Sequence, residues 1–402
     1  MADIIDRRKM SPTSSAYDTN NENDGLKPEA TSATAKLNQI VLSRIQAAIT
    51  ADPEVSLRRE VQRILKEAFD EQRSSMPSSK NPKFANAPTE RRDFCARLVA
   101  RTSNAEIIYA LSDETRKVLS SYMEPDSGSE LIEASIVTLL SRMILSCEKL
   151  WEVPTRGVVL KCNSRLAAKI IKGNNDYTEY TSMQYLEENA PDVPAPRPHG
   201  LVKFGSARIM FMTYFPSTTL ESAWPNLTHE NKLLIQHQLN DIFLKLRALT
   251  STGVEHILGG VNGEGVQDLR RDGHATRETI STVAAFEDFQ FSIPPHNTSS
   301  FVKFLRSLLP PASSTVVFTH GDVRTANIMV DIDQTGIYHV TGIIDWETSG
   351  FYPEYFESSK ILYLFRLYKE EDWWQYLPPC IAPAKNPEMW LIDRLWDMIV
   401  YA

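Results

Sequence analysis

The sequence has few cysteines and no long apolar run, and each absence excludes a class of protein. The 402 residues include only four cysteines, Cys95, Cys147, Cys162 and Cys380, and none of them is spaced as Cys-x-x-Cys. The absence of this spacing argues against a zinc site and a disulfide framework and favours reduced, mostly buried thiols. No apolar run approaches the length of a membrane span, and the first residues lack the apolar core of a secretion signal. We therefore expect a cytoplasmic protein with no membrane partner.

Positive charge is also not in excess. The chain has 43 Lys and Arg against 51 Asp and Glu, a formal net charge of −8. Proteins that bind nucleic acid usually present a basic stripe, so no nucleic-acid partner is predicted. The modest acidity is typical of a protein that stays in solution. The length allows one large domain with an extension, or two domains.

The N-terminal third predicts a tail followed by helices. Residues 1–33 are polar and are predicted to be disordered. Apolar residues at helical spacing then predict a helical extension over 34–135, with a proline-containing linker near 74–90. Amphipathic stripes of this kind usually pack on their own core, but a protein partner for these helices remains an alternative.

The remainder divides into a β-rich lobe over 136–215 and a mainly helical lobe over 216–402. In the first lobe, hairpins are predicted around the turns 154–157 and 205–206. A helix is predicted between them, from about residue 177 to 188. A β-rich lobe joined by a short connection to a helical lobe predicts a cleft that holds a nucleotide.

The most informative segments are 319–327 and 342–347. His320-Gly321-Asp322 is followed by Asn327, and the second segment contains Asp345. Two strands around the turn 333–336 predict a hairpin that brings Asn327 and Asp345 to the same end, with Asp322 in the loop just before. One carboxylate can accept a hydroxyl proton there, and an amide with a second carboxylate can hold Mg²⁺. These are the parts of a phosphoryl-transfer site.

The stretch from about residue 158 to 360 resembles the aminoglycoside phosphotransferase and choline kinase family of the protein-kinase-like superfamily, in particular its fungal group. The resemblance is carried by short motifs that occur in the family's order: Val159-Leu160-Lys161-Cys162, Glu179, Leu186-Glu187-Glu188-Asn189, Met212-Thr213-Tyr214-Phe215, Thr219 to Trp224, His320 to Asn327, and Ile343 to Glu347 with Gly350 to Glu354. It implies an α+β, bilobal protein-kinase-like fold with an N-terminal helical extension.

The resemblance also implies roles for residues that bind the nucleotide. Lys161 corresponds to the strand lysine that holds the α- and β-phosphates, and Glu179 to the helix glutamate that orients this lysine. The backbone of Met212, Thr213, Tyr214 and Phe215 corresponds to the lobe connector that contacts adenine. Arg324 stands where protein kinases place a lysine that meets the γ-phosphate. The implied cofactors are ATP and Mg²⁺.

Further roles belong to the chemistry. Asp322 corresponds to the aspartate that orients the acceptor hydroxyl and takes its proton, and Asn327 and Asp345 to the metal-holding pair. His320 is expected to brace the loop. Glu354 and Glu357 are expected to stabilise the helix that follows, with a place beside the acceptor as the alternative.

The sequence departs from the family at the phosphate loop, because residues 140–157 hold no glycine-rich run. The expected function is an ATP- and Mg²⁺-dependent phosphotransferase that acts on a hydroxyl of an unidentified small molecule. The alternative is a non-catalytic binding or scaffold protein with a kinase-like fold. The retained Lys161, Asp322, Asn327 and Asp345 favour the enzyme.

Overall fold

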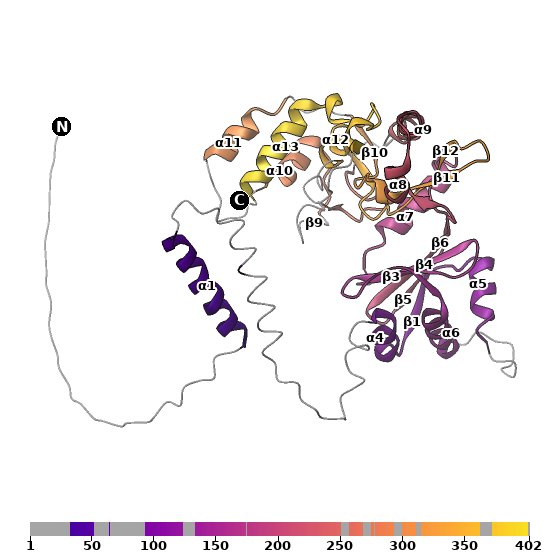
Figure 1. The fold of residues 1–402 in the computed structure, drawn as a ribbon. Helices are drawn as coiled ribbons and strands as arrows, with labels where there is room; N and C mark the ends of the chain where they lie inside the picture. The colour runs from indigo at the N-terminus through magenta and orange to yellow at the C-terminus, as the bar shows by residue number, and fades with distance from the viewer. Residues whose placement is uncertain are drawn as a thin grey trace, which may run out of the picture. The chain divides into compact units, whose positions relative to one another are not determined.

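A computed structural model describes residues 33–51, 64, 93–123, 133–173, 175–250, 257–267, 275–276, 278–292, 300–310, 315–361 and 372–400 (Figure 1). The chain divides into two compact units, 1–85 and 86–402. In the first unit the structure describes helix α1 (Ala33–Ala51). The predicted linker near 74–90 lies outside the described residues, as does the predicted disordered tail up to residue 32.

The second unit begins with a lobe built on a six-stranded antiparallel sheet, whose strand order is β1-β5-β6-β4-β3-β2. Its strands are β1 (Ala105–Tyr109), β2 (Glu148–Val153), β3 (Gly157–Lys161), β4 (Leu166–Lys172), β5 (Pro198–Phe204) and β6 (Ala207–Thr213). Its helices are α4 (Phe94–Arg101), α5 (Asp113–Ser120), α6 (Glu133–Ser146) and α7 (Thr178–Asn189). Both predicted hairpins are confirmed, as β2–β3 and β5–β6, and the helix between them is α7.

The two faces of this sheet pack against different partners, because successive side chains of a strand point to opposite faces. In β4, Ala168 and Ile170 join the core formed with α4, α5 and α6. Ala167 faces the other way, into the core shared with α7 and the second lobe. Figure 1 shows α4, α5 and α6 together on one side of the sheet and α7 on the other. A side chain on the Ala167 face of β4 therefore points toward the second lobe.

The predicted boundary between extension and lobe at residue 135 is wrong. Ala105–Tyr109, within the expected helical extension, is a strand that pairs with β5. Helices α4 and α5, on either side of it, contribute Phe94 and Leu119 to the core of the sheet. Helical spacing in α4 and α5 was read correctly, but five residues of strand between two short helices are too few to give a period of their own.

The second lobe combines short strands with helices. Its strands are β7 (Thr218–Thr219), β8 (Val266–Gln267), β9 (Ala275–Thr276), β10 (Val316–Thr319), β11 (Ile328–Ile332), β12 (Tyr338–Ile343) and β13 (Gly350–Pro353). Its α-helices are α8 (Leu220–Ala223), α9 (His229–Arg247), α10 (Val283–Gln290), α11 (Ser300–Ser307), α12 (Phe356–Lys360) and α13 (Pro387–Val400). Short 3₁₀ turns lie at Trp224–Asn226, Thr325–Asn327, Asp372–Gln375 and Pro383–Lys385. None of the helices in the described part of the chain is long and apolar enough to cross a membrane.

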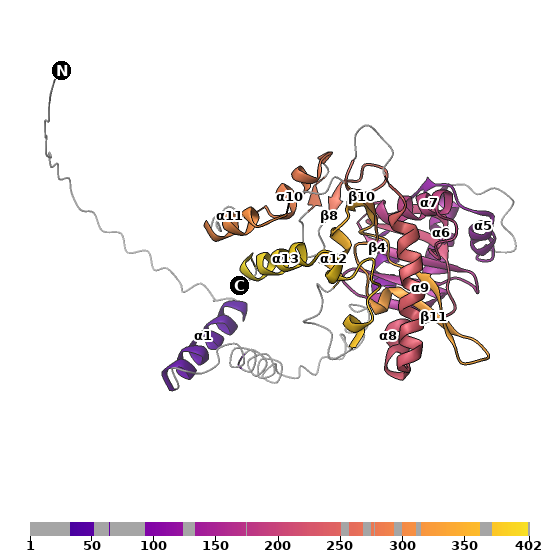
Figure 2. The same cartoon turned by 90° about the horizontal axis from the view of Figure 1, so that it is seen from above.

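Local sequence signals fix where several helices begin. The hydroxyl of Thr228 accepts the Asn231 N–H at the start of α9, and Thr282 does the same for Ala285 at the start of α10. Each side chain satisfies a backbone N–H that the helix leaves without a partner. Helix α9 buries Ile235, Leu239 and Phe243, and it lies against the β11–β12 hairpin (Figure 2), where Gln238 donates to the Tyr338 carbonyl of β12 at 3.0 Å. The two lobes confirm the bilobal α+β fold class.

Candidate active site

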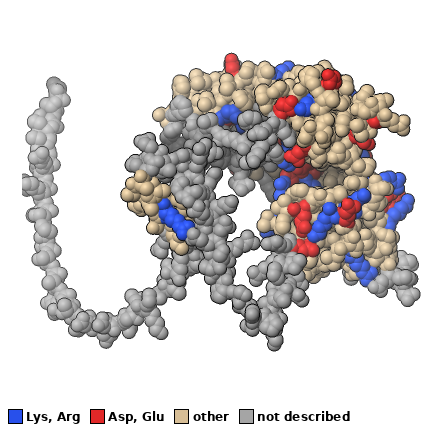
Figure 3. Space-filling model, in the orientation of Figure 1, with Lys and Arg blue, Asp and Glu red and all other residues tan. Residues whose placement is uncertain are grey.

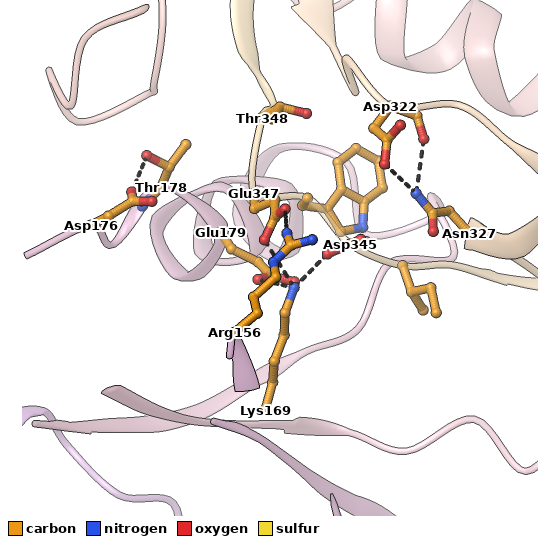
Figure 4. Close-up of polar contacts among 12 residues, drawn as sticks. Arg156, Lys169, Asp176, Thr178, Glu179, Asp322, Asn327, Asp345, Glu347 and Thr348 are labelled. Atoms are coloured by element: carbon orange, nitrogen blue, oxygen red, sulfur yellow. Dashed lines mark hydrogen bonds and ion pairs between the residues drawn. The ribbon is translucent and has the colours of Figure 1, made fainter. Parts of the chain in front are cut away.

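The centre of the site is the Lys169 ammonium, which comes from β4 (Figure 4). It donates to Glu179 Oε2 at 2.6 Å and to Asp345 Oδ1, and it lies 3.5 Å from Glu347 Oε2. Lys169 and Glu179 are 8% and 6% exposed as side chains. A buried ammonium is stable only among such partners, because burial of an isolated charge is very costly. The three carboxylates therefore hold one cation, and the cation holds them together.

The geometry of β4 explains why the Lys169 side chain points toward these carboxylates. It lies on the same face of β4 as Ala167, the face that points toward α7 and the second lobe. Glu179 stands in the first turn of α7, where a carboxylate is favoured by the helix dipole. Burial alone would lower the pKa of Lys169, but the charges of Glu179, Asp345 and Glu347 raise it overall. Lys169 is therefore protonated at neutral pH.

The prediction that Glu179 orients Lys161 is wrong. Lys161 ends β3, and its Nζ lies 3.7 Å from Glu148 with a side chain 36% exposed. Its ammonium lies over the ring of Tyr214, 5.2 Å from the centroid. In the sheet, Lys161 pairs with Ala167 and Val159 pairs with Lys169. Lys161 thus shares a face with Lys169 but lies two positions nearer the lobe connector and one strand further out.

Strand β4 was not predicted from the sequence, and with it Lys169 was missed. Residues 166–172 read Leu-Ala-Ala-Lys-Ile-Ile-Lys, and all but the last are buried. A strand buried on both faces has no alternating pattern, so periodicity does not reveal it. The signal in the sequence is a lysine inside an apolar run, because a buried cation needs partners of opposite charge.

Asp345 and Glu347 reach the same point from the second lobe. The hairpin of β11 and β12 places Ile344 opposite Asn327, and the Ile344 N–H donates to the Asn327 carbonyl at 2.9 Å. Asp345 follows with φ of 69°, a left-handed conformation that Asp tolerates better than most residues. Burial raises its pKa, but the charge of Lys169 outweighs burial and lowers it overall. Asp345 is therefore a carboxylate at neutral pH.

Asp322 lies in a loop that other buried groups hold in place. The Glu357 carboxylate of α12 accepts the N–H of His320 at 2.7 Å and of Gly321 at 3.0 Å. His320 Nδ1 accepts the Asp322 N–H at 3.1 Å, which leaves its Nε2 to donate to the Ile344 carbonyl at 3.0 Å. Gly321 has φ of 82° and a Cβ there would meet the Thr348 carbonyl at 2.8 Å. This arrangement agrees with the expected bracing role of His320.

The predicted trio of Asp322, Asn327 and Asp345 does gather. Asn327 Nδ2 donates to the carbonyl and to Oδ2 of Asp322, both at 2.9 Å. Arg324 joins the two acids, with Nε 3.2 Å from Asp322 and Nη2 3.6 Å from Asp345. Burial raises the pKa of Asp322 to about 6 although Arg324 opposes this.

Glu354 and Glu357, which the sequence left between two roles, have different surroundings. Glu357 is 1% exposed and holds the loop from His320 to Asp322 as described. Glu354 lies nearer the surface, with Oε1 3.4 Å from Arg247 and 3.8 Å from Lys385. Neither contact places Glu354 beside Asp322.

Arg156 completes the group of charges and was not singled out from the sequence. It lies in the turn between β2 and β3, and its guanidinium pairs with Glu347 (Figure 4). The side chain is 50% exposed. This turn is the loop of the sheet that reaches the acidic residues. Figure 3 shows basic and acidic side chains meeting in the recess between the lobes.

The carboxylates form a possible cation site. Oxygen atoms of Glu179, Asp345 and Glu347 lie within 4.8 Å of one another. Hard oxygen donors of this kind suit Mg²⁺. Asn327, the other predicted metal-holding residue, is tied to the Asp345 segment through the Ile344 N–H.

The segment predicted to contact adenine leads out of β6. Met212 and Thr213 end this strand. The N–H groups of Thr213 and Tyr214 already donate to carbonyls of Arg197 and Arg165, at 3.0 and 2.8 Å. The Phe215 ring lies against the backbone of β12, where a Cβ on Gly342 would meet it at 2.9 Å.

Comparison with known proteins finds a family model that matches the part of the chain from α7 onward. Residues 177–373 match the phosphotransferase enzyme family. The match includes Glu179, Asp322, Asn327 and Asp345, and it begins after Lys169. A comparison with curated protein sequences finds no match.

Several solved structures are similar at low identity. An aminoglycoside-3'-phosphotransferase of type VIII is 17% identical, with 63% of this chain and 93% of that chain covered and a TM-score of 0.38. An aminoglycoside phosphotransferase from Streptomyces rimosus is 13% identical, with 67% and 98% covered and a TM-score of 0.39. A third phosphotransferase, in a complex with gentamicin, is 13% identical, with 67% and 87% covered and a TM-score of 0.40. No substrate of this chain follows from likenesses at this level. Residues 177–373, just under half of the chain, are thus similar to the phosphotransferase enzyme family.

Proposed function

We propose that the protein transfers the γ-phosphoryl group of ATP, with Mg²⁺, to a hydroxyl of a small molecule. The observation that carries the proposal is the meeting of Lys169 and Glu179 from one lobe with Asp345 from the other. Asp322 lies on the same side of the second lobe, joined to Asp345 through Arg324. Phosphoryl transfer needs little covalent chemistry from a protein and depends on positioning and charge. The group of charges supplies both.

The resting contacts suggest an exchange of partners when Mg²⁺ and ATP bind. In the described structure the cations Lys169, Arg156 and Arg324 pair with the acids of the site. Triphosphate oxygens offer Lys169 and Arg156 new partners, and bidentate contacts suit the Arg156 guanidinium. Asp345 and Asn327, with Glu347 beside them, are then free to hold the metal. Held by these residues, Mg²⁺ would supply positive charge against the negative charge that develops during transfer.

Asp322 is the residue that would receive the hydroxyl proton. Its carboxylate is held by Asn327 and Arg324, so its direction is fixed. A pKa raised to about 6 makes it a better proton acceptor than an ordinary aspartate, while it remains mostly ionised at pH 7. It aligns the acceptor oxygen with the γ-phosphorus and takes the proton as the new O–P bond forms, while the bond from the γ-phosphorus to the bridging oxygen breaks and ADP leaves.

Thermal melting of the full chain, with and without Mg²⁺ and ATP, tests the nucleotide site. A ligand that binds the folded state raises the melting temperature. We expect a rise that needs both Mg²⁺ and ATP and is lost in Asp345→Ala. Asp331→Ala is a matched control, because Asp331 lies on the exposed end of the same hairpin. No rise for the wild type at millimolar nucleotide would contradict the proposal.

Transfer is tested by ADP release in the presence of hydroxyl-bearing metabolites, sugars and amino alcohols. For an acceptor that stimulates release, Asp322→Asn should lower turnover by about 10²–10⁴-fold, the usual contribution of a positioned acid or base. Its melting shift with Mg²⁺ and ATP should remain. Normal turnover in Asp322→Asn would overturn the assigned role of Asp322.

A further inference from the structure

Two of the four cysteines face each other at the open end of the β2–β3 hairpin. Cys147 directly precedes β2, and Cys162 directly follows β3. The adjoining residues Glu148 and Lys161 are paired partners in the antiparallel ladder. The ladder ends at that pair, and each cysteine is the next residue beyond it: the Cys147 N–H donates to the Met143 carbonyl of α6, and the Cys162 N–H donates to the Leu166 carbonyl. These cysteines are 15 positions apart in the sequence, so their numbers alone give no sign of the pairing.

The two thiols also point to the same side. Both pack against the core that α6 forms with the sheet. Each thiol shifts the pKa of the other. Cys147 Sγ also lies 3.5 Å from the Tyr122 hydroxyl, and Cys162 Sγ lies 4.0 Å from Met143 Sδ. Both thiols are free in the structure and each is partly exposed.

We infer that Cys147 and Cys162 are an oxidation site, which a hydroperoxide converts to a reversible cross-strand disulfide. Directly opposite residues of an antiparallel pair, such as Glu148 and Lys161 beside the two cysteines, have Cα atoms about 4.5–5.5 Å apart. This spacing falls within the range of about 4.4–6.8 Å that disulfides use. The hairpin therefore needs little backbone movement to close the bond.

The chemistry begins at Cys147. Its thiolate is stabilised by hydrogen bonds from Cys162 and Tyr122, which lower its pKa to about 6. The thiolate attacks the peroxide oxygen, the O–O bond breaks, and the sulfur becomes a sulfenic acid while the peroxide is reduced to water or an alcohol. The Cys162 sulfur then attacks the sulfenic sulfur. An S–S bond forms, and the hydroxyl leaves as water with the Cys162 proton.

The other two cysteines serve as internal controls. Burial raises the pKa of both Cys95 and Cys380 to about 11, so their thiolates are scarce at neutral pH. Cys95 is buried in α4. Cys380 lies in the second lobe, where its backbone N–H donates to Asn240 Oδ1. Selective oxidation should therefore spare both.

The test uses the reduced full chain exposed to hydrogen peroxide under native conditions, followed by thiol counting and peptide mapping. We expect the count to fall from four to two, with one linked peptide pair that contains Cys147 and Cys162. Dithiothreitol should restore the count. The cross-linked chain should melt at a higher temperature than the reduced chain, because the bond restricts the unfolded state.

Variants separate the proposal from general oxidation. Cys147→Ser should abolish the cross-link, whereas Cys95→Ser should leave it unchanged. In Cys162→Ser, Cys147 should accumulate a sulfenic acid that dimedone traps. The wild-type peptide map decides the question even if a variant does not fold. Sulfinic acid at Cys147 without a cross-link, or links to Cys95, to Cys380 or between chains, would overturn the proposal.

Discussion

At the scale of single residues, the site is a set of charges that neutralise one another. Lys169 lies among Glu179, Asp345 and Glu347. A buried lysine of this kind is held by its partners and in turn permits their burial. Lys161, on the same face of the sheet, lies in contact with solvent. We therefore predict different effects for substitutions of the two lysines.

Replacing Lys169 with Met should abolish detectable phosphoryl transfer, because the phosphates lose their buried cation. The change should also lower the melting temperature, since the buried Glu179 carboxyl loses the ammonium that compensates its burial. Lys161→Met is the matched control and should change turnover by less than about threefold, as expected for an exposed ion pair. Turnover measured for both variants decides between the two lysines. Loss of activity in Lys161→Met alone would restore the original assignment.

His320 gives a prediction about pH. Burial lowers the pKa of His320 below its usual 6.5, although the charges of Glu357 and Asp345 oppose this. The folded state therefore holds neutral His320, and the unfolded chain binds a proton once pH falls through about 6.5. The stability that neutral His320 contributes is complete above this pH and is lost as pH falls, by up to about 1.4 kcal/mol per pH unit.

Urea unfolding from pH 7.5 to pH 5 tests this, with His320→Asn as the comparison. The variant removes this titration while keeping a side chain that can donate and accept. The wild type should lose stability more steeply on acidification, so its advantage over the variant should shrink as pH falls. Parallel curves for the two proteins would show that His320 titrates as an ordinary histidine.

At the scale of elements, a short helix holds the loop that carries His320, Gly321 and Asp322. Glu357 of α12 accepts two backbone N–H groups, those of His320 and Gly321. The loop therefore takes its shape from a helix more than thirty residues further along the chain. Thr348, which donates to the His320 carbonyl at 3.2 Å, adds a second tie.

Substitution of Glu357 by Gln should lower the stability of the fold by about 1–3 kcal/mol, because an amide leaves one buried N–H facing a donor. Glu354→Gln is the control, since Glu354 makes only partly exposed ion pairs, and should cost less than about 1 kcal/mol. Chemical unfolding of both variants measures the difference. Equal losses of stability in the two variants would show that the hydrogen bonds of Glu357 contribute no more than the exposed ion pairs of Glu354.

The elements also show how far the sequence leads. The hairpin of β11 and β12 was predictable because turn residues separate two apolar runs, and it carries Asn327 and Asp345 together. Strand β4 was not, because burial on both faces removes alternation. The partner of Glu179 and the place of Arg156 depend on which strands lie side by side. Strand order is a property of long-range packing that local patterns do not contain.

At the scale of the whole second unit, ion pairs cross between the lobes. Lys169 and Arg156 come from the sheet, and their partners Asp345 and Glu347 follow β12 in the other lobe. Arg156 stands in the turn where related kinases use glycine-rich backbone to cover phosphates. In this chain the charge of the Arg156 guanidinium would hold the phosphates in place of those backbone N–H groups. Breaking the ion pair between Arg156 and Glu347 costs little free energy, because the Arg156 side chain is 50% exposed.

We therefore expect Arg156→Ala to weaken the binding of Mg²⁺ and ATP by about 3–30-fold, the effect of losing one charge-assisted contact that replaces another. Binding of adenosine, which has no phosphate, should stay the same. Lys149→Ala is the matched control, because Lys149 lies on the same hairpin but pairs with Asp93 and Glu152, away from the site. Isothermal titration of the wild type and both variants with each ligand measures these affinities. Equal losses for adenosine and for ATP would show that Arg156 supports the hairpin and does not meet the phosphates, whereas unchanged ATP binding would show that the lobes hold the nucleotide without it.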